Sequence, residues 1–186
     1  MARPRGFEPD EALTAIKEAF WRGGYDATSM RDIEQATGLN KQSLYRLYGD
    51  KRGMYLKAID HYSAHEATAA GVLLGDGAQG SARARFARLF GRVVDIAVAG
   101  DRRGCFFCNV SIDQAHRDER VRAAAMRGME AMRATFEETL GAQGEAAPAN
   151  IRQKAAGLLI AYLGLRVMDR AGFDEASLRC AVDDAL

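Results

Sequence analysis

The chain has 186 residues, of which 48% are apolar, and a formal net charge of +1. This composition excludes a largely disordered chain and a strongly basic polyelectrolyte, and the length suits one compact domain or two small ones. Three cysteines, an odd number, argue against a secreted disulfide framework and favour a reducing compartment. The longest apolar windows fall short of the roughly 20 residues that cross a bilayer. We therefore expect a soluble, cytoplasmic protein with no membrane partner.

The hydrophobic pattern is helical along almost the whole chain. Leu13, Ile16 and Phe20 recur at spacings of three and four residues, and the same spacing returns within residues 86–94 and 121–140. No convincing alternating run, typical of strands, competes with it. We therefore predict an all-α fold of about nine helices, counted from their start and stop signals. The glycines at the expected helix ends are Gly23, Gly24, Gly38, Gly100, Gly141 and Gly172.

Two short helices are predicted between residues 28 and 48. Thr28 is a good N-cap for the first, and Gly38 supplies the left-handed residue that ends it, after which Asn40 caps the second. Two short helices joined by a turn with glycine form a helix-turn-helix, whose second helix reads the major groove of DNA. The residues at the start of that helix, the part that reaches base edges, are Lys41, Gln42 and Ser43.

The same region carries a local excess of positive charge. Residues 38–59 contain five basic side chains and a single carboxylate, that of Asp50, and phosphate contacts require such an excess. Lys51 begins a further helix, so its ammonium and the free N–H groups of the helix start could together hold a phosphate. Tyrosine hydroxyls can add phosphate hydrogen bonds. The other candidates on this side of the second helix or its flank are Tyr45, Arg46 and Tyr48.

Residues 11–59 resemble the DNA-binding domain of the TetR family of transcriptional regulators. The matching segments read "FWRGGY", "TSMRDI", "TGLNKQSLY" and "YGDK". The family usually has Phe where Tyr48 stands and Glu where Arg52 stands, so the detail of phosphate contact differs here. The resemblance implies that Thr28, Tyr45 and Lys51 anchor phosphates, and that Lys41, Gln42, Ser43 and Arg46 contact bases or lie near them.

The resemblance also implies a second, divergent domain. We expect a three-helix DNA-binding domain in residues 1–55 and a helical ligand-binding and dimerisation domain in residues 56–186. The last two helices resemble the face through which family members form a homodimer, and small residues such as Gly157 and Gly164 would let a partner helix approach closely. The implied function is a dimeric repressor that binds a palindromic double-stranded DNA operator and is released by an unknown small-molecule effector.

An effector pocket is expected among the aromatic and methionine residues in the middle of the chain, because methionine adapts to irregular apolar ligands. Most of these residues are expected to be ordinary core. The candidates for contact with the effector are Phe86, Phe90, Cys105, Phe107, Met129 and Met132.

The cysteines and histidines provide two alternative interpretations. Cys105 and Cys108 form a C-x-x-C pair, and the neighbouring arginines at 102 and 103 could lower the pKa of the Cys105 thiol, making a sensor of oxidants or electrophiles. Burial as small hydrophobes is the other interpretation of these thiols.

The second alternative is a metal-dependent helical enzyme. His61 and His65 are four residues apart, so they share a helix face and could bind a metal if a carboxylate such as Glu66, or a distant ligand, joined them. The chain has no phosphate-binding glycine loop, nucleophile elbow or H-E-x-x-H motif. We therefore expect no enzymatic activity, no bound metal and no cofactor.

Overall fold

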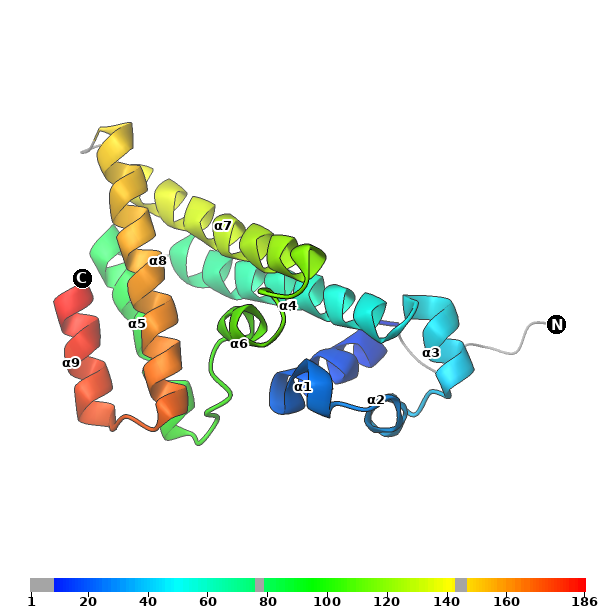
Figure 1. Cartoon of the computed structure of the whole chain (residues 1–186). Helices are drawn as coiled ribbons and strands as arrows, with labels where there is room; N and C mark the ends of the chain where they lie inside the picture. The colour runs from blue at the N-terminus through cyan, green and yellow to red at the C-terminus, as the bar shows by residue number, and fades with distance from the viewer. Residues whose placement is uncertain (1–8, 76–78, 143–146) are drawn as a thin grey trace.

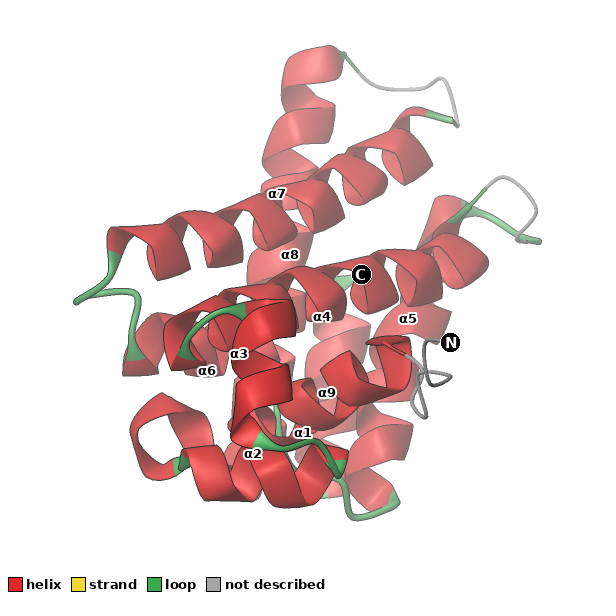
Figure 2. Ribbon diagram, turned by 90° about the vertical axis from the view of Figure 1, so that its right-hand side faces the viewer, coloured by secondary structure: helices red, strands yellow, loops and turns green. Residues whose placement is uncertain are grey.

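The computed structural model describes residues 9–75, 79–142 and 147–186. Within these ranges the chain forms nine helices and no strands, which confirms the all-α prediction, and Figure 2 shows helices and connecting loops throughout. The helices are α1 (Pro9–Ala27), α2 (Met30–Thr37), α3 (Lys41–Tyr48), α4 (Lys51–Leu74), α5 (Ala82–Val98), α6 (Phe106–Asp113), α7 (Glu119–Gly141), α8 (Pro148–Ala171) and α9 (Glu175–Ala185).

Four helices, α2, α5, α7 and α8, end at or within two residues of a glycine that was predicted to end a helix. Gly38 closes α2 and Gly172 closes α8, both in the left-handed conformation with φ of 68° and 92°. Gly24 has φ 75° and ψ 175°, so the backbone breaks there although helical hydrogen bonding resumes for a few residues. Proline stands at the first position of α1 and α8, where its missing N–H costs no hydrogen bond.

α4 and α7 lie side by side and run in the same direction (Figure 1). An ion pair between Arg52 and Asp118 joins their starts, and Thr139 Oγ1 donates to the carbonyl of Leu74 at 3.3 Å near their ends. The first three helices gather at the start of α4, whereas α5, α8 and α9 stand across its other end. The helix α4 therefore connects the two halves of the molecule.

The buried residues form two cores. The first draws on α1, α2, α3, the first half of α4, α6 and the start of α7. The second draws on the end of α4, α5, the later part of α7, α8 and α9, and Met129 and Leu163 pack against both. The expected domain boundary after residue 55 falls inside α4, and residues 1–8 of the expected first domain lie outside the described ranges.

Candidate nucleic-acid interface and interior cavity

Side-chain caps fix the position of α2. Ser29 is the N-cap: its hydroxyl accepts from the Asp32 amide, and the Asp32 carboxylate accepts from the Ser29 amide at 2.7 Å. The prediction that Thr28 caps this helix is therefore wrong. Thr28 is instead buried, and its hydroxyl donates to the carbonyl of Gly24 at 2.7 Å, which ties the end of α1 to the turn before α2.

The helix α3 is held rigidly at its start. Asn40 is its N-cap, as predicted, and its Oδ1 accepts from the Ser43 amide at 2.9 Å. The Glu34 carboxylate of α2 accepts from the amide of Lys41 at 2.5 Å, so two of the free N–H groups at the start of α3 are satisfied by side chains. Leu44 is fully buried and anchors the inner face of α3 in the first core.

The outer face of α3 carries most of the predicted contact residues. Lys41, Gln42, Tyr45 and Arg46 are exposed, and Ser43 is half-buried. Tyr48 differs from the prediction. It lies one turn after Leu44 on the inner face, only 8% exposed, and its hydroxyl donates to the carbonyl of Pro9 at 3.1 Å. The side chains of Thr28 and Tyr48 are therefore committed to internal contacts and are not presented at the surface.

The start of α4 presents one of its two basic residues for binding. The Lys51 ammonium lies 4.5 Å from the centroid of the Tyr25 ring, a cation–π contact that holds the half-buried side chain beside the helix start. The guanidinium of Arg52 is paired with Asp118 at the start of α7. Much of the positive charge of Arg52, which was expected to add to phosphate contact, is therefore neutralised by this ion pair.

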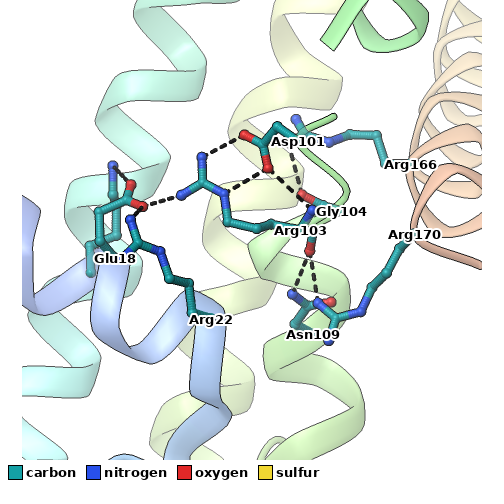
Figure 3. A network of polar contacts seen from close by, with 9 residues as sticks. Glu18, Arg22, Asp101, Arg103, Gly104, Asn109, Arg166 and Arg170 are labelled. Atoms are coloured by element: carbon teal, nitrogen blue, oxygen red, sulfur yellow. Dashed lines mark hydrogen bonds and ion pairs between the residues drawn. The ribbon is translucent and has the colours of Figure 1, made fainter. Parts of the chain in front are cut away.

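Arg103 connects the first helix to the loop before α6, as Figure 3 shows. Its guanidinium pairs with Asp101 at 2.6 Å and also with Glu18 of α1. The hydrogen bonds from Arg103 lower the pKa of the Asp101 carboxyl, despite its partial burial. The carbonyl of Arg103 accepts from Asn109 at 3.1 Å and from Arg170 of α8 at 2.8 Å. One loop thus contacts α1, α6 and α8.

A cavity of about 180 Å³ lies beside this loop. Its polar lining includes two ion pairs, Glu66 with Arg166 at 3.0 Å and Asp101 with Arg103. Two further lining groups, Trp21 Nε1 and Asp169 Oδ1, are buried and have no hydrogen-bond partner among the described residues. Burial raises the pKa of the Asp169 carboxyl. The residues that line the cavity therefore include two ion pairs, one buried donor and one buried acceptor without a partner among the described residues.

Of the six residues predicted to contact an effector, Met132 alone is among those lining this cavity. The three phenylalanines are buried against other aromatic rings: Phe86 on Phe136, Phe90 on Tyr162 and Phe107 on Tyr62, with centroids 4.9–5.5 Å apart. Phe86 and Phe90 border two other pockets. Cys105 is buried, and Met129 lies between the two cores.

The Cys105 thiol lies at the N-cap of α6, where Tyr62 donates to its Sγ at 3.8 Å. Burial raises the pKa of this thiol, but a hydrogen bond from Cys108 and the nearby Arg166 guanidinium outweigh burial and lower it to about 7. The hydrogen bond to Cys105 raises the pKa of Cys108, which keeps its proton. The expected cations were the arginines at 102 and 103, so the source of the positive charge was predicted wrongly.

The histidines of α4 meet a carboxylate that the sequence did not identify. Asp10, in the first turn of α1, lies beside His61 and His65. Glu66, the carboxylate considered from the sequence, instead pairs with Arg166.

None of the helices in the described ranges is long and apolar enough to span a membrane.

The arrangement of α2 and α3 defines a helix-turn-helix, and comparison with known proteins shows which family this part of the chain resembles. Residues 12–58 match the family described as bacterial regulatory proteins, tetR family. These residues therefore form an N-terminal domain of the TetR type. Because this is a family of regulatory proteins, the expectation that the chain is not an enzyme agrees with its relatives.

Relatives match over different shares of the chain. The transcriptional repressor BdcR of Escherichia coli K12 is 35% identical over 74 residues, 40% of this chain and 38% of BdcR. The regulator YezE of Bacillus subtilis 168 is 31% identical over 119 residues, 63% of this chain and 60% of YezE. The matches thus span less than two thirds of these curated relatives.

A solved structure extends the likeness to nearly the whole chain. A cysteine mutant of the TetR family transcriptional regulator CifR, complexed with 26 bp operator DNA, superposes with a TM-score of 0.82 at 26% identity. The match covers 98% of this chain and 97% of CifR. The likeness therefore includes the helices that follow the helix-turn-helix as well as the helix-turn-helix itself.

Proposed function

We propose that this chain is a dimeric transcriptional repressor that binds a palindromic DNA operator and is released by a small-molecule effector. The observation that carries the proposal is the outer face of α3, a short helix fixed at its start by two side-chain caps and exposing Lys41 and Gln42. This is the end of a recognition helix that reaches base edges in the major groove. Operator DNA is the partner in the CifR complex, which supports a DNA partner for this chain. A cytoplasmic location is part of the proposal, because the proposed partner is DNA.

The contacts divide into two kinds. Lys41, Gln42 and Ser43, with Arg46 beside them, read or lie near base edges, whereas Tyr45 and Lys51 hold phosphates. We leave out the side chains of Thr28 and Tyr48 because their hydroxyls already donate to backbone carbonyls. The DNA-binding domain comprises residues 1–55 and the regulatory domain residues 56–186, with α4 passing from one into the other.

The dimer forms through α8 and α9. Along α8, Gly157, Ile160, Gly164 and Met168 follow one another at spacings of three and four residues and so share one face. Ile160 is 71% exposed, and a side chain added at either glycine would meet no other atom within 4 Å. An exposed apolar stripe with room for a second helix is typical of a symmetric interface. Phe173, which is 49% exposed beside α9, extends the same surface.

The effector binds in the cavity beside the Arg103 loop. Its volume of about 180 Å³ limits the effector to a small molecule. When their side chains turn toward the bound effector, Asp169 Oδ1 accepts a hydrogen bond from it and Trp21 Nε1 donates one to it. The effector is therefore a small polar molecule that carries both a donor and an acceptor, with an apolar part against Leu73 and Val93.

A second candidate trigger is modification of Cys105. Its pKa of about 7 leaves a substantial fraction as thiolate at neutral pH, the form that attacks oxidants and electrophiles. CifR was solved as a cysteine mutant. Diamide or N-ethylmaleimide should release the wild type from its operator and leave Cys105→Ser bound. An equal response of the two proteins would eliminate this trigger without affecting the repressor proposal.

The experiment that tests the repressor proposal is selection of bound sequences from a random duplex pool by the purified full chain. We expect an enriched palindrome whose half-sites are separated by about one helical turn of DNA. Gln42→Ala should relax the selected bases, whereas Ser63→Ala on α4, outside the proposed interface, should select the same palindrome. Selection of no common sequence by the reduced wild-type protein would refute the proposal.

A further inference from the structure

Three side chains with metal-binding atoms meet between α1 and α4. Asp10 lies in the first turn of α1, and His61 and His65 lie one turn apart on α4. One ligand atom from each residue lies within 4.8 Å of the other two. The two imidazole rings have centroids 4.3 Å apart, and the three residues line the same open depression. Two residues from one helix and one from another thus converge on a single point.

A fourth residue orients the buried imidazole. Thr14, one turn after Asp10 on α1, places its Oγ1 2.9 Å from Nε2 of His61. When Nε2–H donates to this hydroxyl, Nδ1 carries the lone pair and faces Asp10 Oδ1 at 3.6 Å, beyond hydrogen-bond distance. Two acceptors facing each other are stabilised by a cation between them. A ligand histidine whose second nitrogen is hydrogen-bonded is the usual arrangement at protein metal sites.

We propose that Asp10, His61 and His65 bind one divalent late transition-metal ion, with Zn²⁺ as the first case. Two imidazoles and one carboxylate are a ligand set that Zn²⁺ accepts, and water would supply the fourth position. Mg²⁺ and Ca²⁺ prefer oxygen ligands and would not bind here. This assignment replaces the expectation from the sequence that the chain holds no metal.

The geometry permits closure around an ion. Bonds of about 2.0–2.1 Å in a tetrahedral site bring neighbouring ligand atoms to about 3.4 Å, which is closer than the present upper separation of 4.8 Å. Asp10 and His65 are exposed and can rotate inward, while His61, 8% exposed, is already fixed by Thr14. Arg92 borders the same depression, and its positive charge will reduce the affinity for a cation.

The ion would join the start of α1 to α4. Both helices belong to the first core, so the metal would stabilise the folded unit that carries α3. The inference concerns a site distinct from the α3 surface and from the cavity beside Arg103. It therefore stands or falls independently of the proposed repressor function.

The test is calorimetric titration of the purified full chain with Zn²⁺, with Ni²⁺ and Mg²⁺ as separate arms. We expect one Zn²⁺ or Ni²⁺ per chain and no binding of Mg²⁺. His65→Ala and Asp10→Asn should abolish saturable binding, and Thr14→Val should weaken it by about 10- to 100-fold, the usual effect of removing a partner of a ligand histidine. The melting temperature should rise with Zn²⁺ in the wild type and stay constant in His65→Ala.

Two controls separate this site from other ligands in the chain. His116 is the third histidine of the sequence and is exposed, so His116→Ala should bind Zn²⁺ as the wild type does. A variant with Cys105, Cys108 and Cys180 changed to serine should also keep its Zn²⁺. Wild-type protein that binds no Zn²⁺, or His65→Ala that binds it equally, would overturn the proposal, as would loss of binding in the cysteine variant alone. Circular dichroism of each variant confirms that the loss does not arise from unfolding.

Discussion

Gly128 of α7 lies against the Phe107 ring of α6, and adding one methyl group there tests the packing directly. A Cβ at this position would lie 2.3 Å from Cζ and 2.4 Å from Cε1 of Phe107, where ordinary contacts begin at 3.4 Å. Phe107 is fully buried, and its ring packs edge-on against Tyr62 with centroids 4.9 Å apart. Because the ring is fully buried, Gly128→Ala forces the ring, or the helix α6 that carries it, to shift by about 1 Å.

The expected cost follows from two opposing effects. Overpacking a filled core costs about 1–3 kcal/mol, and the better helix propensity of alanine returns about 1 kcal/mol. We therefore expect Gly128→Ala to lower the free energy of unfolding by up to about 2 kcal/mol. Gly71→Ala is the matched control, because Gly71 is an exposed position in α4 with no atom within 4 Å of an added Cβ. It should gain stability of about 0.5–1 kcal/mol.

Thermal unfolding followed by circular dichroism measures both effects. A change of 1 kcal/mol shifts the melting temperature of a chain of this size by roughly 2–4 °C. The two variants should therefore move in opposite directions, at one fixed protein concentration because the stability of a dimer depends on it. A Gly128→Ala protein that melts at or above the temperature of Gly71→Ala would refute the close packing of α6 on α7.

Three further measurements test the interface, the link between halves and the thiol. Lys51→Ala should weaken binding to all DNA sequences and reduce the slope of log affinity against log salt concentration by about 1. Gln42→Ala should reduce the free energy of binding by roughly 1–3 kcal/mol on the operator alone. Mobility-shift assays at several salt concentrations distinguish the two effects. Asp118→Asn keeps a capping oxygen at α7 but loses the charge that pairs with α4, so its melting temperature should fall at low salt and approach the wild type at high salt. The Cys105 thiolate, whose pKa is lowered, should be present above about pH 7 and lost below it, and its absorbance at 240 nm should titrate there; in Cys108→Ala the midpoint should be higher.

Local signals predicted the helices well and failed where neighbouring residues compete. Gly38 ends α2 and Asn40 caps α3, as predicted. Gly38 is the one glycine and Asn40 the one asparagine at that turn. Thr28 and Ser29 are both good caps, and the choice falls on Ser29 because Asp32, three residues later, completes the reciprocal pair of hydrogen bonds. The burial of Tyr48 was also readable, since it follows the apolar Leu44 by four residues and so shares its inward face.

The residues that line the cavity could not be predicted in the same way, because the lining depends on contacts between segments far apart in the chain. The three phenylalanines expected to line a pocket pack against other aromatic rings, and two of them border pockets other than the cavity beside the Arg103 loop. The cavity is lined by polar groups of α1, α4, α8 and the loop before α6, which no local pattern brings together. One feature of the sequence could have indicated a polar interior. Arg166 and Asp169 follow the apolar run of α8 and are three residues apart, and both are buried. Asp10 is a comparable case, since only the packing of α1 on α4 places it beside two histidines.

The cavity lies along α4, and this position would allow binding of the proposed effector to alter the position of the DNA-binding surface. α4 has 24 residues, about 36 Å of helix. The first core holds it through buried positions between residues 54 and 62, and the second core holds it through Ala70 and Leu74. Glu66 and Leu73, which line the cavity, lie between these two attachments or at the second one. If the proposed effector binds there and prefers a different position of this segment, it would tilt α4, whose start packs against α3. The size of the shift would be limited by the difference between the affinities of the effector for the two positions.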